Sequence, residues 1–342
     1  MKTLAVGTEK GAYVVTNEPD WQVRGPLFPG WKVTAFGLAP DGTYLAGLAS
    51  NWFGASVHRS PDLVEWEQVA AGPAFAEGSE RKLNQIWGFS KNGQMLYAGV
   101  DDAGLFRSAD NGLTWEPVAA LNEHPSRQSW YPGAGGMCAH HILHDGQRMW
   151  VGISAVGVFR SEDDGESFDR VDQGVPPTVG PDEDETTAEG WCVHGLTADP
   201  ENPNRIWRQD HRGVYRTTDG GDHWERIEEG LPANFGFAIG RDHGSGNLFV
   251  VPLEADTNRL PVDGHLAAYR SKNDGDSWEP SGDGWAAAPQ FTGVLRKAMT
   301  LDQRGGVTFG TTGGTIYQSQ DTGDSWSTLP FSFPRVFALA DL

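Results

Sequence analysis

The sequence has few cysteines, no long apolar run and few stretches free of helix breakers. Only Cys138 and Cys192 are present among 342 residues, which excludes a disulfide framework. The start, MKTLAVGTEKGAYVVT, is too interrupted for a signal peptide, and no apolar run approaches the length of a membrane span. We therefore expect a cytoplasmic protein, with a secreted form as the alternative, and 45 Gly and 21 Pro argue against long helices.

Basic residues are also scarce. The chain has 26 Lys and Arg against 46 Asp and Glu, a formal charge of −20. Such a field repels phosphates, so neither nucleic acid nor an anionic membrane surface is an expected partner. An acidic ligand would need a local basic pocket.

What the chain does have is a repeated phrase. RSADNGLTWEPV begins at Arg107, and similar phrases follow at intervals of about fifty residues, the period of a propeller or solenoid. Four short β-rich runs bounded by turn residues accompany each phrase. The Ser or Thr of each phrase is Ser60, Ser108, Ser161, Thr217, Ser271 or Ser319, and a decayed seventh copy ends at Val23.

Seven such units predict an all-β chain, a seven-bladed β-propeller of four-stranded antiparallel blades formed by residues 1–342 as one domain. The N-terminal copy lacks a first strand, whereas the C-terminal segment RVFALADL reads as a first strand without a blade. We expect these two ends to pair and so close the ring.

The phrase, S-x-D-x-G-x-[ST]-W, resembles the Asp-box, or BNR repeat, of the sialidase-like propeller superfamily, and the resemblance covers essentially the whole chain. It implies a turn between third and fourth strands, on the face opposite the active site. The Asp would cap its own turn, the Gly would take a positive φ, and the Trp would pack between blades. Four aspartates are thus expected to be structural: Asp110, Asp163, Asp219 and Asp321.

True sialidases of this superfamily carry an Arg-Ile-Pro motif near the N-terminus of a six-bladed ring. The nearest match here is RLP at 259–261, late in the chain, so sialidase activity is rejected. The segments HRGVYRT, VPLEAD and RKAM instead resemble the bacterial seven-bladed "BNR-like glycosyl hydrolase" group, whose reaction the resemblance does not settle.

Function is expected where the repeats diverge. When the first strands are aligned on their terminal Asp, aromatic residues dominate one column, but His140, His194 and Lys297 depart from it, and Arg296 precedes Lys297. The other interpretation is that the histidines are core residues with local hydrogen bonds. The full column is Phe36, Trp87, His140, His194, Phe237, Lys297 and Phe337.

Unusual connections are expected on the same face. WRQDHRG replaces the usual small residues after a second strand and places Arg208, Gln209, Asp210 and His211 at the rim. A long insertion carries Glu254 and Asp256, and long loops in compact folds are usually functional. Trp130 and Trp191 lie in this region too, either to stack on sugars or to fasten the loops.

These residues predict a carbohydrate-active enzyme, glycoside hydrolase- or lyase-like, with a small-molecule or carbohydrate ligand and a monomeric state. Hydrolysis would use the facing carboxylates Asp210 and Glu254. A lyase would use a divalent metal, with Arg296 holding a uronate. The alternative is a non-catalytic binding or assembly propeller. The expected catalytic residues are His140, His194, His211, Asp210 and Glu254; the ligand-binding residues are Arg296, Lys297, Arg208, Gln209, Trp87, Trp191 and Trp130; the possible metal ligands are His140, His194 and His211.

Each cysteine lies two residues before one of the aligned histidines. A Cys2His2 metal site is one interpretation of this pattern, although the spacing matches no established motif. Small, buried, reduced thiols are the other.

Overall fold

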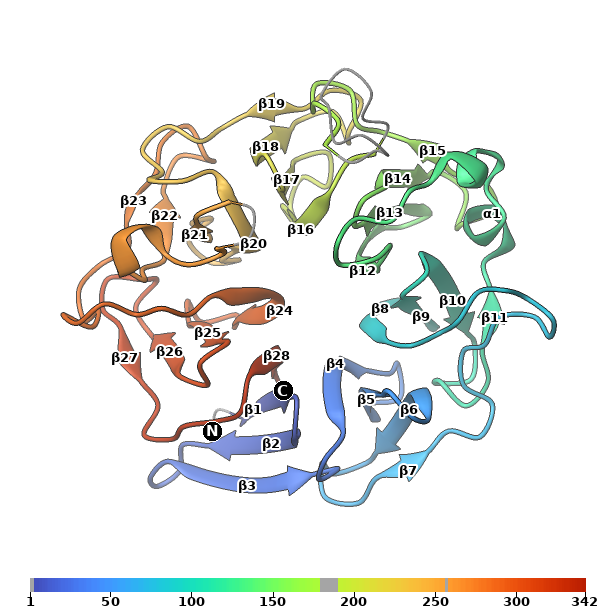
Figure 1. Cartoon of the computed structure of the whole chain (residues 1–342), viewed down its shortest axis with the longest axis horizontal. Helices are drawn as coiled ribbons and strands as arrows, with labels where there is room; N and C mark the ends of the chain where they lie inside the picture. Colours follow the sequence, from blue (N-terminus) through green and yellow to red (C-terminus); the bar gives the residue numbers. More distant parts are fainter. Residues whose placement is uncertain (1–2, 179–189, 256–257) are drawn as a thin grey trace. The chain divides into compact units, whose positions relative to one another are not determined.

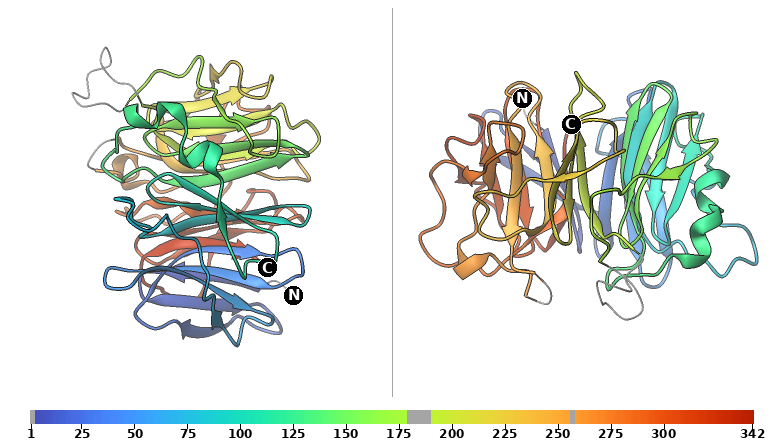
Figure 2. Two further views of the ribbon diagram at one scale, coloured as in Figure 1. Left: turned by 90° about the vertical axis from the view of Figure 1, so that its right-hand side faces the viewer. Right: turned by 90° about the horizontal axis from the view of Figure 1, so that it is seen from above.

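The computed structural model describes residues 3–178, 190–255 and 258–342, and it is built almost entirely of β-strands (Figure 1). The helical elements are short: α1 (Ala119–Asn122), η1 (Pro125–Ser129) and η2 (Val262–Gly264). Helix α1 lies outside the strands of its unit (Figure 2). No helix within the described residues is long and apolar enough to cross a membrane.

The chain divides into two compact units. The β4–β15 unit holds three four-stranded sheets, each antiparallel and ordered as in the chain. Their strands are β4–β7 (Lys32–Leu38, Tyr44–Ser50, Gly54–Ser60, Glu67–Gln68), β8–β11 (Ile86–Asn92, Met95–Val100, Gly104–Ser108, Glu116–Pro117) and β12–β15 (Ala139–Asp145, Arg148–Ile153, Gly157–Ser161, Asp169–Arg170).

The β16–β28 unit also contains the N-terminal strands β1–β3. It has two four-stranded sheets and one eight-stranded sheet. The four-stranded sheets are β16–β19 (Val193–Ala198, Ile206–Asp210, Gly213–Thr217, Glu225–Arg226) and β20–β23 (Phe235–Arg241, Leu248–Leu253, Tyr269–Ser271, Glu279–Pro280). The eight-stranded sheet contains β24–β27 (Val294–Leu301, Val307–Thr311, Ile316–Ser319, Ser327–Thr328), β28 (Val336–Asp341) and β1–β3 (Thr3–Thr8, Gly11–Thr16, Gln22–Leu27).

The eight-stranded sheet joins the two ends of the chain. C-terminal strand β28 pairs antiparallel with N-terminal strand β1, for example Val6 with Leu339, so the expected pairing of the ends is present. Strand β28 meets β24 through one parallel pair, Lys297 with Ala338. The structure thus has six sheets of uneven size, consistent with a β-propeller, and the seven blades and the single domain stay predictions.

The repeated phrases form the turns between third and fourth strands. Asp110 Oδ1 accepts hydrogen bonds from the amides of Leu113 (3.1 Å) and Thr114 (2.9 Å), and Ser108 Oγ accepts from the amide of Gly112 (2.8 Å). Gly112 has φ +84°, a backbone conformation that would be strained in a residue with a side chain. Burial raises the pKa of Asp110, but hydrogen bonds from Thr114 and Ser108 outweigh it and lower that pKa to about 2. The predicted capping role is confirmed.

Two tryptophans of these turns fasten one sheet to the preceding one, whereas Trp115 bonds to Gly112 of its own turn. Within the β16–β28 unit, Trp278 Nε1 donates to the Ile227 carbonyl at 2.8 Å, and Trp326 Nε1 donates to Ser281 Oγ at 3.3 Å. Inner strands such as β9 and β21 are buried on both faces, whereas the fourth strands are exposed. Packing between sheets therefore supplies most of the core.

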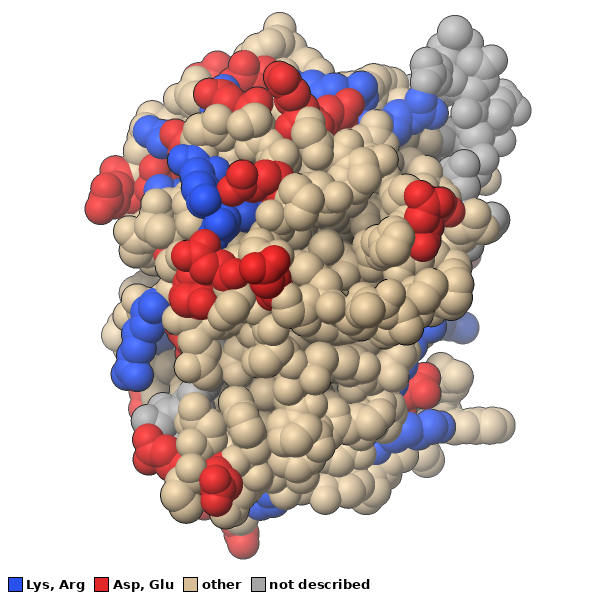
Figure 3. Space-filling model, turned by 90° about the vertical axis from the view of Figure 1, so that its left-hand side faces the viewer, with Lys and Arg blue, Asp and Glu red and all other residues tan. Residues whose placement is uncertain are grey.

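Charged residues gather on the outer strands. In Figure 3, acidic and basic side chains lie beside one another over part of the face, and a broad neutral area separates them from smaller charged groups near its edges. Pairs such as Arg216–Glu225 (2.7 Å) and Lys272–Glu279 (3.0 Å) join third strands, or the turn after them, to fourth strands. Exposed pairs of this kind contribute at most about 1 kcal/mol each, so they are not what holds the sheets together.

Candidate functional site

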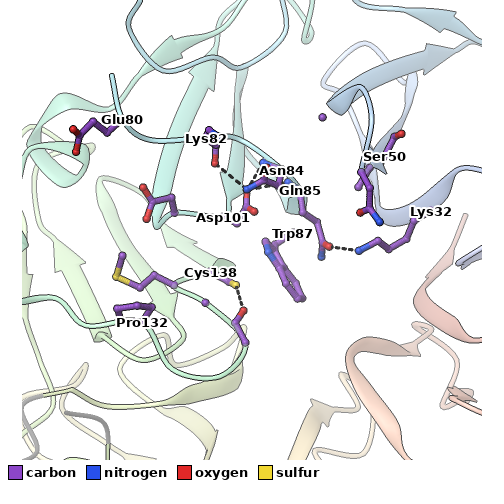
Figure 4. A pocket seen from close by; sticks show the side chains of 17 residues that line it. Lys32, Ser50, Glu80, Lys82, Asn84, Gln85, Trp87, Asp101, Pro132 and Cys138 are labelled. Carbon is purple, nitrogen blue, oxygen red and sulfur yellow. Dashed lines mark hydrogen bonds between the residues drawn. The ribbon is translucent and has the colours of Figure 1, made fainter. Parts of the chain in front are cut away.

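A cavity of about 660 Å³ opens in the β4–β15 unit (Figure 4). The indole of Trp87, on β8, lies in the middle of the lining side chains, and polar groups surround it. Lys32 Nζ donates to Gln85 Oε1 at 2.9 Å. The main polar and aromatic lining residues are Lys32, Asn84, Gln85, Trp87, Asp101 and Cys138.

A β-bulge aims Trp87. In the pairing of β8 with β9, Ile86 faces Val100 and Gly88 faces Gly99, so the register shifts at Trp87. The same shift falls at His140 on β12 and at Thr34 on β4. Bulges re-aim a side chain and are common next to functional sites.

The bulges correct the alignment of the first strands. The residue of β4 that corresponds to Trp87 and His140 is Thr34, not Phe36 as expected. The reason is turn length: Leu38 pairs with Tyr44 across a longer connection than the one between Asn92 and Met95. Counting back five residues from Asp41 therefore ends at Phe36, two residues short of the bulge at Thr34.

Asp101 is one of the three acidic residues that line this pocket, and sequence reasoning missed it. Its Oδ1 accepts from the amides of Asn84 (2.8 Å) and Gln85 (2.9 Å). Burial raises its pKa, although these hydrogen bonds oppose the shift. The sequence did contain a signal for this residue. Asp101 directly follows the second strand β9, and Asp210 is the last residue of the second strand β17. Polar residues at this connection were noticed only in the later repeat.

His140 has backbone and side-chain partners. Its Nε2 lies 2.9 Å from both the Val193 carbonyl and Ser154 Oγ, and its Nδ1 lies 2.6 Å from Nδ1 of His141. Its ring also meets that of Trp87 edge-on, with centroids 6.4 Å apart. His140 therefore lies behind the pocket as a fully hydrogen-bonded residue.

The same hydrogen bond recurs at the aligned positions. Thr34 Oγ1 donates to the Ile86 carbonyl at 2.6 Å, and His194 Nδ1 donates to the Gly236 carbonyl at 2.6 Å. As with His140 and Val193, the acceptor is the residue just before the aligned position of the next repeat. Each of these side chains therefore acts as a clasp onto a backbone carbonyl, which is a structural role.

A second group surrounds Phe237 in the β16–β28 unit. The ring of His194 lies 4.7 Å from that of Phe237 and 5.6 Å from that of His211. The guanidinium carbons of Arg296 and Arg259 lie 4.7 Å and 5.6 Å from the Phe237 centroid. The structure thus brings together the predicted residues His194, His211 and Arg296.

Lys297 and Glu254 belong to the same unit. Half-buried Lys297 has no hydrogen-bond or ion-pair partner among the residues described, and burial lowers its pKa to about 8. Glu254 is half-buried and accepts a long hydrogen bond from Asn258 (3.3 Å). Asp256 lies outside the described residues.

The expected rim position is wrong for three residues. Arg208, Gln209 and Asp210 are at most 1% exposed. Arg208 and Asp210 are two apart on β17, so they point to the same side, where Arg208 Nε donates to Asp210 Oδ2 at 2.9 Å. Burial raises the pKa of Asp210, and Arg208 opposes the shift. Gln209 donates to the Asn234 carbonyl at 3.0 Å.

Trp130 and Trp191 have partners within the structure. Trp130 Nε1 donates to Ser126 Oγ at 2.9 Å, and the guanidinium of Arg127 lies 4.8 Å from its ring. Trp191 lies 4.0 Å from the guanidinium of Arg170. These contacts match the loop-fastening interpretation, while a role of either residue in ligand binding stays a prediction.

Two of the three expected metal ligands come together in the β16–β28 unit. The ring centroids of His194 and His211 lie 5.6 Å apart. A metal at these residues stays a prediction.

Comparison with known proteins supports the fold class. No protein-family model and no curated protein matches the sequence. Among solved structures, YCF48 from Cyanidioschyzon merolae is similar with a TM-score of 0.59 and 15% identity, covering 89% of this chain and 87% of that one. An ancestral GH74 enzyme has a TM-score of 0.54 at 14% identity, covering 89% of this chain and 37% of that chain.

PorZ of Porphyromonas gingivalis, a component of the type-IX secretion system, is similar with a TM-score of 0.54 and 13% identity, over 88% of this chain and 33% of that one. These proteins are β-propellers of the BNR-like type. At such identities the similarity supports the propeller fold, and both enzymes and non-catalytic proteins share it.

Proposed function

We propose that this chain is a carbohydrate-binding propeller whose ligand lies in the pocket around Trp87. The observation that carries the proposal is the bulged Trp87 within a polar cavity of about 660 Å³. An indole offers a face for the apolar side of a sugar ring, and the surrounding amide, carboxylate and ammonium groups match its hydroxyls.

The charges of the pocket favour a neutral ligand. Lys32 and Lys82 stand against Glu80, Asp101 and Asp102, so the two signs nearly cancel. An acidic peptide or a polyuronate would meet no excess of positive charge there. A neutral oligosaccharide needs only hydrogen bonds and stacking.

The test is a panel of neutral oligosaccharides measured by titration calorimetry. Trp87→Ala should weaken binding by about 10-fold or more, because the stacking face is lost. Trp87→Phe keeps a ring face and should retain most of the affinity. Phe291, an aromatic residue that is 74% exposed and outside the pocket lining, gives the control Phe291→Ala. Undiminished binding by Trp87→Ala would contradict the proposal.

A glycoside-processing enzyme is the second candidate, and Asp101 is the observation that favours it. A general acid needs a carboxyl group that stays protonated, and burial raises the pKa of Asp101 within the pocket. Asp101→Asn should then abolish turnover while leaving binding nearly unchanged, and activity should fall as pH rises through the pKa of Asp101. Binding without turnover in the parent protein would leave the non-catalytic function.

The peptide-bound YCF48 structure suggests the alternative ligand class. That protein is described as bound to a D1 peptide, with a TM-score of 0.56, 14% identity, and 89% of this chain and 85% of that chain covered. Extended neutral peptides therefore belong in the same titrations, and a preference for them over every oligosaccharide would replace the ligand class proposed here.

A further inference from the structure

We propose that the turn between β5 and β6 is a second sugar-binding subsite beside the Trp87 pocket, so that the ligand is a linear oligosaccharide and not a single sugar. The inference rests on the proposed function and extends it. The turn contains Trp52 and Phe53, whose side chains are 89% and 79% exposed. Both residues belong to the β4–β15 unit, as do all the residues that line the pocket.

The fold does not require large rings at this turn. In each sheet of the unit, three residues separate the second strand from a third strand that begins with Gly. The last of the three is Ala103 in the β8–β11 sheet and Val156 in the β12–β15 sheet, and both are at most 2% exposed. In the β4–β7 sheet the same position holds the exposed Phe53, and Trp52 precedes it. Adjacent exposed rings of this kind form an apolar patch, which marks a binding surface.

Hydrogen bonds hold the turn in one shape. Ser50 Oγ accepts from the amide of Trp52 at 3.2 Å and from that of Phe53 at 3.4 Å. Ser50 and Gly54 form the last pair between β5 and β6, and Gly54 has φ +73°, a conformation that favours glycine. A turn that is ordered before the ligand arrives loses little conformational freedom on binding, which favours affinity.

The two rings have different surroundings. Phe53 stacks on Trp31, with centroids 5.8 Å apart and an interplanar angle of 27°, and this contact covers one of its faces. Trp52 has no ring partner among the residues that the structure describes, and it is the more exposed of the two. Trp52 therefore offers the open stacking face, and Phe53 with Trp31 supports the turn beneath it.

The turn is continuous with the pocket. Ser50, Asn51 and Gly54, which flank the two rings in the sequence, line the cavity. In Figure 4, Ser50 lies on one side of Trp87 and Cys138 lies on the other. A chain that leaves the pocket on the Ser50 side therefore meets the aromatic turn.

Two aromatic faces with polar groups between them match a linear chain of neutral sugars. The apolar face of one sugar can stack on Trp87 and that of a later sugar on Trp52, while hydroxyls meet the polar groups of the pocket. The turn itself carries no charged residue, so a charged polymer gains nothing there. Affinity should therefore rise with chain length until both rings are covered.

The experiment measures this length dependence by titration calorimetry on the full chain. The probes are cello- and manno-oligosaccharides, from the monosaccharide to the hexasaccharide. In the parent, the hexasaccharide should bind about 10-fold more tightly than the disaccharide, since stacking contributes about 1.4 kcal/mol. Trp52→Ala should lose this gain and bind the disaccharide like the parent, whereas Trp87→Ala should weaken binding at every length.

Phe291→Ala is the control, because Phe291 is also an exposed aromatic residue but lies outside the pocket lining. It should bind every length like the parent. Trp52→Phe keeps a ring and should retain part of the gain. Trp52 is exposed and buries little surface, so its variants should fold like the parent.

The outcomes separate the two proposals. Equal affinity of Trp52→Ala and the parent for the hexasaccharide would overturn the second subsite and leave the pocket at Trp87 intact. Absence of binding at every length in the parent would overturn both. Exposed Trp and Phe also suit a lipid surface. Binding of the parent to phosphatidylcholine vesicles that Trp52→Ala loses, with unchanged hexasaccharide affinity, would assign the turn to a membrane instead.

Discussion

Two Cys-x-His segments occupy equivalent places in successive repeats, yet their histidines use different nitrogens. His140 presents Nε2 to the Val193 carbonyl, whereas His194 presents Nδ1 to the Gly236 carbonyl. The Nδ1 of His140 meets His141, while the ring of His194 faces His211. Equal spacing in the sequence therefore gives two different hydrogen-bond arrangements.

The cause lies in the neighbours that each repeat supplies. Ser154 stands after the second strand beside His140 and joins its hydrogen bonds, with Ser154 Oγ donating to the Val193 carbonyl at 3.1 Å. In the next repeat the corresponding connection carries His211 instead. A hydroxyl extends the hydrogen-bond network of His140, whereas the imidazole of His211 packs against the ring of His194.

The largest effect on stability is expected from protonation of a third histidine, His144, which lies on the same strand as His140. Neither of its ring nitrogens has a hydrogen-bond partner within the described part of the chain, and burial lowers its pKa to about 4. The folded state thus holds this proton less tightly than the unfolded state, whose pKa is about 6.5. Stability should fall as pH drops from about 6.5 towards 4, by at most about 3 kcal/mol.

Chemical denaturation between pH 7 and pH 4 measures this loss. His144→Leu removes the titrating group, so its stability should depend less on pH than that of the parent. A parent and variant with the same pH dependence would show that His144 is protonated in the folded state without penalty. His141→Leu, three residues earlier on the same strand, is the control for the general effect of acid on stability.

Removal of the His140 clasp should have an intermediate effect. His140→Ala deletes a buried ring and its bonds, but Ser154 still donates to the Val193 carbonyl, so no acceptor is left without a partner. We expect a loss of about 2 kcal/mol in the free energy of unfolding. Urea denaturation measures this loss, and a variant as stable as the parent would contradict the clasp role of His140.

The smallest effect is expected at the third clasp. Thr34→Val keeps the shape of the side chain and removes the hydrogen bond of Thr34 Oγ1 to the Ile86 carbonyl. The loss should be about 1 kcal/mol, measured as a shift in the urea midpoint at constant slope. Ile86 precedes Trp87, so the same variant should weaken glycan binding slightly; a change larger than that of Trp87→Ala would contradict the pocket assignment.

Local chemistry let the sequence predict much of the fold. The Ser, Asp and Gly of each phrase lie within five residues, and their turn forms as expected because its hydrogen bonds need no distant partner. Of the site, the sequence singled out Trp87 and His194 in the aligned column and His211 in the WRQDHRG connection. It missed Asp101, whose pKa shift and place in the pocket depend on burial by other segments.

The rim expectation failed for a physical reason. The polar residues of WRQDHRG suggested an exposed segment, but Arg208 and Asp210 are buried and form an ion pair with each other within the sheet. A sequence does not reveal whether two opposite charges on alternate positions of a strand face water or each other.

By itself, the sequence determined an all-β chain of repeated four-strand units, the turns that end the third strands, and the pairing of the two chain ends. Those features follow from short-range patterns of turn residues and alternating apolar residues. The tertiary structure decided where the bulges fall, which carbonyl each clasp reaches and which ring nitrogen of each histidine makes that bond. These features depend on contacts between strands about fifty residues apart. Turn length and burial determine them, and neither can be predicted from the sequence of a single repeat.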